Sequence, residues 1–393
     1  MSEVFIVAAR RTAIGKFQGA LGTVAATDLG AAVIRAVLAD SGVEARLVDH
    51  VCMGHVLAAG AGQNTARQAA IRAGLPVEVP ATTVNMVCGS GLEAVQLGAQ
   101  AIRLGDAQIV VAGGMENMSL APYCLPKARS GLRMGNATLV DSMISDGLWD
   151  AFGDCHMGIT AENLARRHGI GRDAQDAYSL QSQQRAIAAQ DAGRFTAEIT
   201  AVELAKKGGG TQPFLVDEQP RRDVEEASLA TLKPAFDKSG SVTAGNASTL
   251  NDGAAAVVLA SATAVKQYRL PVIARVVAAA RAGVDPAYMG EGPIPATRRC
   301  LDKAGWSVPS LDLVEANEAF AVQALTVLRQ LELDSARVNV NGGAIALGHP
   351  IGASGTRVLV TLLHEMARRQ VARGLATLCV GGGQGIAMAV ERS

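Results

Sequence analysis

Two cysteines, a histidine and an asparagine stand in glycine-bounded segments of this sequence, where their side chains could do chemistry. The first cysteine, Cys88, lies in the run 84–91, between an apolar stretch typical of a strand and the start of a predicted helix. Unpaired N–H groups and the dipole at a helix start favour a thiolate, so we expect a lowered pKa and a nucleophilic sulfur. The alternative is a buried structural cysteine that behaves as a small hydrophobe.

His349 is the second candidate, in the run 339–352 between two groups of glycines. Pro350 restricts the backbone beside it, and the residue does not lie on the apolar face of a helix. This position suits a general base that could take the proton of a nucleophile. The alternative is an ordinary histidine of a surface loop.

A second cysteine and an asparagine complete the set. Cys379 ends a predicted buried strand that opens into Gly381, Gly382 and Gly383. A desolvated thiol beside an imidazole could exchange protons with a substrate carbon, and glycine N–H groups could form an oxyanion hole. Asn317 also follows a predicted strand and could hold a water or a carbonyl oxygen. Taken alone, Cys379 is a core residue and Asn317 a helix cap.

An internal repeat indicates how these residues are positioned. At an offset of 263 residues, four positions of the first part match four of the second: Leu38, Gly42, Asp49 and Val51 fall on Leu301, Gly305, Asp312 and Val314. The patterns predict helices over 32–41, 90–104, 297–304 and 354–369, and strands over 48–53, 109–112, 311–316 and 376–380. The strand 109–112 should stop at Gly113. The repeat therefore predicts two similar α/β halves with buried, mostly parallel strands. The symmetry of the two halves should bring Cys88 and His349 towards one seam.

The residues between the two copies do not fit the repeat. They include a loop-like stretch over 122–135 and helical runs over 161–168 and 172–191. We interpret this region as an insertion in the first half that covers one of its faces.

Composition narrows the class of protein. The chain has 393 residues, 36 basic and 36 acidic side chains and only 3% aromatic residues, which makes nucleic acid an improbable partner. Six scattered cysteines without a CxxC pair indicate neither a disulfide framework nor a zinc site, and favour a reducing compartment, the cytoplasm. No apolar stretch approaches the roughly 18 residues of a membrane helix, and residues 4–9 predict a buried strand instead of a signal peptide.

Taken together, the four segments resemble the thiolase family over essentially the whole chain. Cys88 lies in Val-Cys-Gly-Ser-Gly, Asn317 in Asn-Glu-Ala-Phe, His349 in Gly-His-Pro-Ile-Gly and Cys379 in Cys-Val-Gly-Gly-Gly-Gln-Gly. The segments 156–163 and 243–248 look like those of biosynthetic acetoacetyl-CoA thiolases.

The resemblance implies a five-layered αβαβα core of two similar halves. Residues 1–118 and 251–268 would form the N-terminal half, 119–250 an inserted loop domain over the coenzyme A site, and 269–393 the C-terminal half. Relatives of this kind imply a homotetramer, a dimer of dimers.

The resemblance also implies a reversible ping-pong reaction. Cys88 would take an acetyl group from one acetyl-CoA, and a second acetyl-CoA would attack it and leave as acetoacetyl-CoA. His349 would deprotonate Cys88 and help Asn317, through a water, to hold the second thioester oxygen, while Cys379 would move the carbon proton. The N–H groups of Cys88 and Gly381 would stabilise the oxyanion. Coenzyme A thioesters are then substrates, and no metal or other cofactor is expected.

The family also suggests where coenzyme A would lie. The implied contacts are Arg221 at the nucleotide end, Ala244 and Ser248 along the pantetheine, and around them Leu148, His156, Met157, Phe236, Met289, Ala319 and Phe320. Without the resemblance, His156 would be a solvated loop histidine, Met157 and Met289 core residues, and Arg221 part of a solvated face. Two departures from the family stand out: the charged run 222–225 follows Arg221, and Glu93 replaces a common Lys or Gln, which we interpret as a local surface change.

Three alternatives remain open at this stage. The nearest is a degradative thiolase for longer 3-ketoacyl-CoA, with the same catalytic residues and a different pocket. A decarboxylating ketoacyl synthase would need a histidine where Cys379 stands. A non-catalytic dinucleotide- or acyl-binding protein would form no covalent intermediate, and no GxGxxG follows the first strand.

Overall fold

One continuous sheet runs through both halves of the protein in the computed structural model, which describes residues 2–206 and 208–392. Its strand order is β15-β16-β17-β14-β1-β13-β5-β3-β4. Pairs at the two edges are parallel, but every pair from β16 to β5 is antiparallel. The prediction of mostly parallel strands is therefore wrong, because each half inserts antiparallel strands between its edge and the seam.

The N-terminal part of the sheet contains β1 (Val4–Thr12), β13 (Asn251–Ser261), β5 (Ile109–Asn117), β3 (His50–Gly54) and β4 (Ala81–Val84). The strand predicted to stop at Gly113 continues through Gly113 and Gly114 to Asn117. A Cβ atom at Gly113 would lie 2.2 Å from the carbonyl oxygen of Ala255, and one at Gly114 would lie 2.1 Å from that of Gly352. The glycines here permit close backbone contacts within the strand and do not end it.

The C-terminal part contains β14 (Ala274–Gly283), β17 (Gln384–Glu391), β16 (Arg373–Val380) and β15 (Leu313–Ala316). The two parts meet at β1 and β14, where only Phe5 with Arg275 and Ile6 with Ala274 are paired. This narrow join lets the sheet fold around the helices between its two parts.

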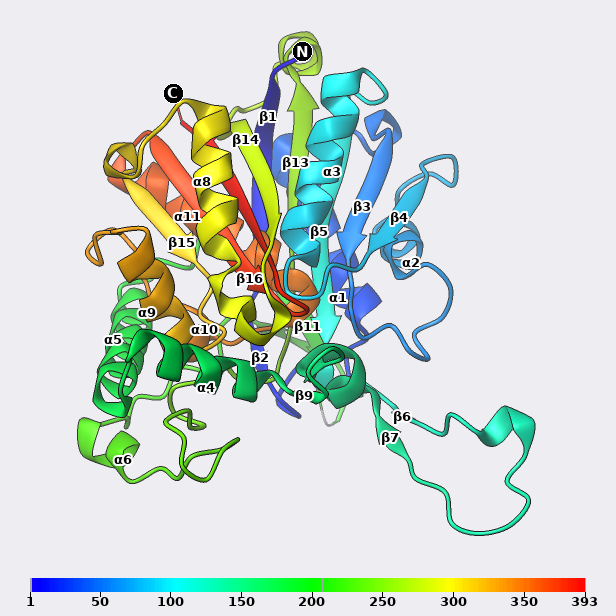
Figure 1. Cartoon of the computed structure of the whole chain (residues 1–393). Helices are drawn as coiled ribbons and strands as arrows, with labels where there is room; N and C mark the ends of the chain where they lie inside the picture. Colours follow the sequence, from blue (N-terminus) through cyan, green and yellow to red (C-terminus); the bar gives the residue numbers. More distant parts are fainter. Residues whose placement is uncertain (1, 207, 393) are drawn as a thin grey trace.

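Helices complete five layers, as Figure 1 shows. One outer layer holds α1 (Ala26–Ser41) and α2 (Thr65–Arg72), and the other holds α8 (Pro293–Ala304) and α9 (Ala321–Gln330). Between the two parts of the sheet lie α3 (Ser90–Leu104) and α11 (Ile351–Arg369), in contact with each other. The thiolase-type αβαβα arrangement predicted from the sequence is confirmed.

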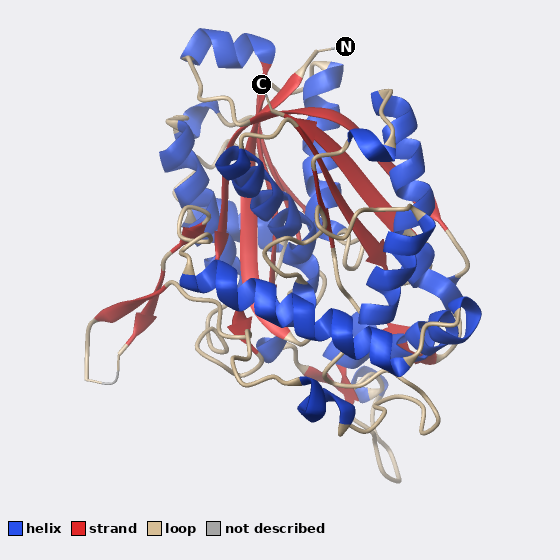
Figure 2. Cartoon of the chain, turned by 90° about the vertical axis from the view of Figure 1, so that its left-hand side faces the viewer, coloured by secondary structure: helices blue, strands red, loops and turns tan. Residues whose placement is uncertain are grey.

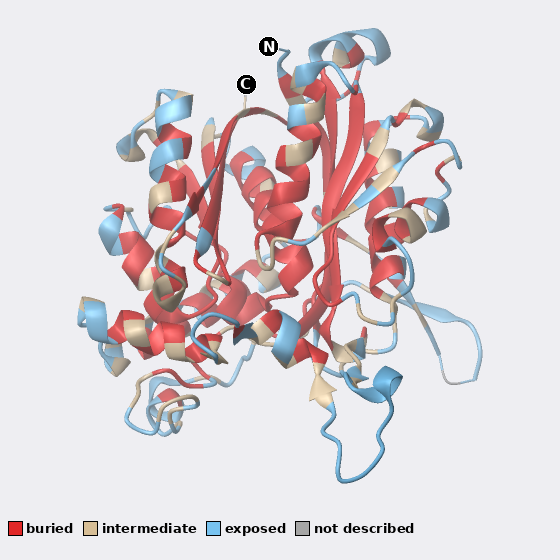
Figure 3. Cartoon of the chain, turned by 45° about the vertical axis from the view of Figure 1, so that its right-hand side comes forward, coloured by how far each residue is buried: buried red, intermediate tan, exposed pale blue. Residues whose placement is uncertain are grey.

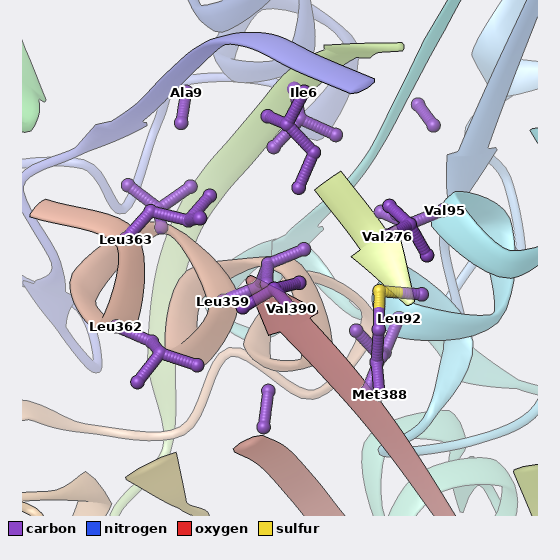
Figure 4. Close-up of a cluster of buried hydrophobic side chains, with 14 of the residues drawn as sticks. Ile6, Ala9, Leu92, Val95, Val276, Leu359, Leu362, Leu363, Met388 and Val390 are labelled. Atoms are coloured by element: carbon purple, nitrogen blue, oxygen red, sulfur yellow. The ribbon is translucent and has the colours of Figure 1, made fainter. Parts of the chain in front are cut away.

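The strands are buried on both faces. On β13, Ala255, Val257 and Leu259 face the central helices, while Ala256 and Val258 face α1. Figure 4 shows the central cluster, where Leu92 and Val95 of α3 approach side chains of α11 and β17. Each leucine buried in this way stabilises the fold by about 1.5–3 kcal/mol, so the central helices are held firmly.

Residues 119–250 lie largely across one end of the strands. Figure 2 shows helices of this region crossing the lower end of the sheet. Its main helices are α4 (Met157–His168) and α5 (Arg172–Asp191), close to the predicted helical runs. The smaller elements are β6 (Tyr123–Cys124), β7 (Val140–Asp141), the turn Met143–Leu148, β8 (Trp149–Asp150), β9 (Cys155–His156), β10 (Ile199–Thr200), β11 (Val202–Ala205), β12 (Thr211–Phe214) and α6 (Glu226–Ala230).

A hairpin from β6 to β7 projects away from the rest of the chain, and its tip is exposed in Figure 3. Elsewhere the inserted region is tied to the sheet by a buried cation. The guanidinium of Arg11 on β1 donates to Glu198 Oε1 at 2.6 Å and to the two carboxylate oxygens of Asp217 at 2.7 and 2.9 Å. No helix in the described ranges is long and apolar enough to cross a membrane.

Glu93 is not the surface change predicted from the sequence. It lies in the first turn of α3, is buried, and both of its carboxylate oxygens accept from Arg281 on β14. Burial raises the pKa of Glu93, and the guanidinium opposes that effect. The pair therefore joins a central helix to the C-terminal part of the sheet.

Candidate active site

Cys88 lies on a tight turn between β4 and α3. The preceding residue, Val87, has φ of +44°, a left-handed conformation that costs a β-branched residue about 1–3 kcal/mol. Ser90 Oγ holds this turn, because it accepts from Met86 N at 2.8 Å and donates to Val87 O at 2.6 Å. The turn presents a partly exposed Cys88 to a cavity.

The predicted low pKa of Cys88 is not found. Burial raises the pKa of the thiol to about 11, although hydrogen bonds from the N–H groups of Gly381 and Cys88 favour the thiolate. Helix α3 starts only at Ser90, with Gly89 as its cap, so Cys88 lies outside the helix and the loss of water is the largest effect on its pKa. Cys88 therefore needs a base to ionise it.

His349 is placed to be that base. It lies in the cavity wall, between α10 (Ala344–Leu347) and α11, and its backbone N–H donates to Asn251 Oδ1 at 2.9 Å. Burial lowers the pKa of the imidazole to about 3, and the charge of Arg357 acts in the same direction. The ring is consequently neutral near pH 7 and can accept a proton.

Asn317 is next to this imidazole. Its Nδ2 lies 3.4 Å from His349 Nε2, and its Oδ1 is buried without a hydrogen-bond partner among the described residues. The helix-cap alternative is wrong, because α9 begins at Ala321 with Phe320 as its cap residue. The side-chain amide thus has an unused acceptor oxygen directly behind His349.

Cys379 lies behind the cavity wall, at the end of β16. It is completely buried in an apolar cluster with Met157, Met289 and Phe320, and burial raises the pKa of its thiol well above the usual value. Met157 packs in this cluster and also lines the cavity that Cys88 enters, and a thiolate at Cys88 would raise the pKa of Cys379 further. The sequence reading of Cys379 as core is correct, but this core borders the nucleophile.

One cavity of about 810 Å³ unites the predicted residues. Elements of both halves and of the inserted region form its walls. Of the predicted residues, it is lined by Cys88, Leu148, His156, Met157, Arg221, Phe236, Ala244, Ser248, Met289, Ala319, Phe320, His349 and Gly381. Asn317 and Cys379 are not in the lining and adjoin it from behind.

The apolar wall is well defined around His156. Its ring stacks on Phe236 with the centroids 4.6 Å apart, and Phe236 meets Phe320 edge to face at 6.2 Å. His156 Nδ1 accepts from Gly158 N at 3.1 Å, and burial lowers the pKa of this histidine. His156 is therefore a neutral helix cap within the wall and not a solvated loop histidine.

Two arginines stand at the mouth of the cavity, and the structure distinguishes them. Both terminal nitrogens of Arg222 donate to Asp191, at 3.0 and 2.6 Å. Arg221 uses its backbone N–H, which donates to Gln183 Oε1 at 2.9 Å. The side chain of Arg222 is thus engaged with Asp191, whereas Arg221 contributes its side chain to the exposed mouth.

Sequence reasoning missed several residues of the site. Lys16, Phe17, Met118, Ile144, Leu250 and Ile351 also line the cavity, but none stands in a pattern that identifies it. Ser354 is different, because its Oγ lies 2.6 Å from His349 Nδ1. The expectation that a helix opens at Ser354 placed this hydroxyl near the histidine without assigning it a role.

Comparisons with known proteins show the family to which the chain belongs. Residues 4–263 match the family description "Thiolase, N-terminal domain" and residues 270–392 match "Thiolase, C-terminal domain". An acetyl-CoA acetyltransferase of Pseudomonas aeruginosa is 65% identical over 392 residues, which is 100% of both chains. The chain belongs to the thiolase family.

Two solved structures have nearly the same fold. The acetyl-CoA acetyltransferase of Bacillus anthracis superposes with a TM-score of 0.98 at 44% identity, covering 100% of this chain and 99% of the other. A human mitochondrial 3-ketoacyl-CoA thiolase gives 0.97 at 45% identity, with the same coverage. The fold is therefore common to thiolases with differently named substrates.

Proposed function

We propose that the protein is an acetyl-CoA C-acetyltransferase, which condenses two acetyl-CoA to acetoacetyl-CoA and coenzyme A and also runs the reverse thiolysis. The observation that carries the proposal is the arrangement of two thiols and one neutral imidazole: Cys88 and His349 line the same cavity, and Cys379 is fully buried in the apolar cluster that borders it. The 65% identical Pseudomonas aeruginosa relative bears the same name.

In the first half-reaction, Cys88 Sγ attacks the thioester carbonyl while its proton passes to His349 Nε2. The oxygen becomes an oxyanion held by the N–H groups of Cys88 and Gly381, which already point at the sulfur. The carbonyl forms again, the C–S bond to coenzyme A breaks, and the leaving thiolate takes the proton of Cys379. Acetyl-Cys88 and a Cys379 thiolate remain.

In the second half-reaction, the Cys379 thiolate removes a proton from the methyl carbon of another acetyl-CoA. Burial raises the pKa of this thiol, which makes its thiolate a stronger base for a carbon acid. His349, together with Asn317 acting through a water, holds the thioester oxygen that gains negative charge. The carbanion attacks acetyl-Cys88, acetoacetyl-CoA leaves, and the Cys88 thiolate recovers the proton held by His349. The steps transfer an acyl group and protons but no electrons, so the proposal requires no cofactor besides the coenzyme A substrates.

The coenzyme A moiety would occupy the cavity mouth, with Arg221 beside its nucleotide end and Ala244 and Ser248 along the pantetheine. Most of the residues assigned to it lie within 119–250, which supports the reading of this region as a loop domain over the substrate. In this proposed division of the chain, residues 1–118 together with 251–268 form the N-terminal core half, and residues 269–393 form the C-terminal core half.

The homotetramer is also part of the proposal. The β6–β7 hairpin carries four exposed apolar side chains away from the rest of the chain: Tyr123, Leu132, Met134 and Leu139. A second copy of this chain is the partner that would cover them in a dimer of dimers. The cytoplasm is the proposed location, in keeping with the free cysteines.

Brief incubation with acetyl-CoA tests the assigned nucleophile. The peptide that contains Cys88 should gain one acetyl group, and Cys88→Ala should lose both the adduct and acetoacetyl-CoA formation. Cys379→Ala should still be acetylated but should form almost no acetoacetyl-CoA, since it lacks the group that moves the carbon proton.

Cys124→Ala is the matched control, because Cys124 lies on the projecting hairpin. This variant should change neither the acetylation of Cys88 nor the formation of acetoacetyl-CoA. An acetyl label on Cys379, or unchanged condensation by Cys379→Ala, would contradict the assigned roles. Failure of the unmodified protein to form any acetyl adduct would reject the proposed activity.

A further inference from the structure

A carboxylate outside the set of reacting residues joins the two halves beside the cavity. Glu116, near the end of β5, has an exposed fraction of 0%. Its oxygens accept from Val56 N and Leu57 N, both at 3.2 Å, and from Gly352 N at 2.9 Å. His55 Nε2 lies 3.2 Å from Oε1. One side chain thus holds the segment after β3 and the first turn of α11.

The partner in α11 is close to the proposed base. Gly352 follows His349 by three residues, so its N–H belongs to the backbone that leads out of the histidine loop. The carbonyl oxygen of Gly352 lies against two glycines of the N-terminal half. A Cβ atom added at Gly54 would lie 2.7 Å from this oxygen, and one added at Gly114 would lie 2.1 Å from it. Larger residues there would push this turn away from the Cys88 half.

The partners after β3 are close to the proposed nucleophile. Val56 and Leu57 share a small apolar cluster with Ile351, and Cys88 packs against that cluster. His55 N also donates to Val84 O at 3.0 Å, at the end of the strand that leads to Cys88. Displacement of the Glu116 contacts would therefore move the two reacting side chains relative to each other.

We propose that Glu116 is a positioning residue, which sets the placement of the His349 loop against the Cys88 turn so that the imidazole can take the thiol proton. This inference rests on the proposed acyl transfer through Cys88. Glu116 touches neither the cavity nor a substrate in this role. It acts through three backbone N–H donors and the nearby His55 imidazole, which come from both sides of the seam.

Glu116→Gln tests the proposal, because the amide keeps the size of the side chain but turns an NH₂ group towards N–H donors. We expect the rate of Cys88 acetylation by acetyl-CoA, and kcat with it, to fall about 10- to 100-fold, while KM for acetyl-CoA changes little. Alkylation of Cys88 by iodoacetamide at pH 8 should slow as well. Glu365→Gln, a substitution of another buried carboxylate near the far end of α11, should leave these rates unchanged.

The alkylation rate separates positioning from simple charge. Burial is the main cause of the raised Cys88 pKa, and the charge of Glu116 adds to it. If charge alone mattered, Glu116→Gln would ease thiolate formation and speed alkylation. Faster alkylation, or acetylation at the rate of the unmodified protein, would overturn the proposal.

Two more variants keep the test decisive if Glu116→Gln does not fold. Glu116→Asp retains the charge and shortens the reach, and Gly352→Ala would place a Cβ 2.7 Å from Glu116 Oε2. Both should slow acetylation, with folding checked by circular dichroism, and a normal rate in either folded variant contradicts positioning. If acetyl-CoA acetylates no form of the protein, the proposed function fails, and the alkylation rates still decide the role of Glu116.

Discussion

His349 Nδ1 and Ser354 Oγ lie 2.6 Å apart, and the serine hydroxyl also donates to Pro350 O at 2.9 Å. Because the single hydroxyl proton of Ser354 is used on Pro350, the serine oxygen must accept from the imidazole. The proton of the neutral ring therefore sits on Nδ1, and the lone pair sits on Nε2, the nitrogen near Asn317. Ser354 thus selects the tautomer that a general base requires.

Ser354→Ala should release this selection. We expect the rate of Cys88 acetylation to fall about 10- to 100-fold, as when partners that orient a functional histidine are removed. Ser354→Thr keeps the hydroxyl and should retain most of the rate. Rapid-quench measurement of acetyl-Cys88 checks this, and equal rates for Ser354→Ala and the unmodified protein would contradict the tautomer assignment.

The acid side of the pH profile should be unusually flat. His349 has its pKa lowered to about 3 and Cys88 has its pKa raised to about 11, so the neutral thiol and neutral imidazole coexist between those values. Acetylation of Cys88 should vary little from pH 5 to pH 8. A fall in rate centred near pH 6.5, the ordinary pKa of histidine, would show that the imidazole is solvated during the reaction.

The same pKa shift predicts how stability depends on pH. A histidine that is neutral in the fold and protonated when unfolded contributes stability above its unfolded pKa of about 6.5. That contribution is lost as the pH falls towards 3. For His349→Asn, thermal unfolding should therefore change less between pH 7 and pH 4.5 than for the unmodified protein. An equal dependence in both would exclude His349 as a source of acid sensitivity.

Acyl length should be limited by the apolar wall. Met157, Met289 and Phe320 are buried around Cys379, so each added methylene of a substrate must displace a packed side chain. Such overpacking costs about 1–3 kcal/mol, or roughly ten- to a hundredfold in kcat/KM. Thiolysis should favour acetoacetyl-CoA over 3-ketoacyl-CoA of six or more carbons. Equal or rising kcat/KM from four to eight carbons would support the degradative alternative instead.

The projecting hairpin should control assembly. Met134 is 98% exposed and Leu132 is 50% exposed, and both would be covered by another copy in the proposed tetramer. Leu132→Asp with Met134→Asp should halve the mass measured by light scattering, leaving a dimer. Thr138→Asp, on the same hairpin, is the control and should not change the mass. An unchanged mass in the double variant would show that the hairpin is not an assembly contact.

The sequence predicted the positions of the site residues better than their electrostatics. Glycine-bounded turns correctly placed Cys88 and His349 on one cavity, because the repeat brings equivalent turns to one seam. The pKa of Cys88 was predicted in the wrong direction, since its burial depends on side chains from distant segments such as Met118 and Ile351. Glu93 was misjudged for the same reason: its partner, Arg281, stands 188 residues away. The sequence predicts a strand end at Gly113 because no local pattern reveals the backbones of Ala255 and Gly352 that lie against Gly113 and Gly114.

The place of β13 also constrains how this protein can be made. This strand lies between β1 and β5, yet it comes from residues 251–261, after the whole inserted region. During synthesis, the first half therefore cannot complete its sheet until more than half of the chain has left the ribosome. Until then β1 and β5 each present an unpaired edge, the kind of surface that invites aggregation. Until β13 is synthesised, the nascent chain therefore exposes two strand edges, and the cavity residues of the inserted region have no complete sheet to pack against.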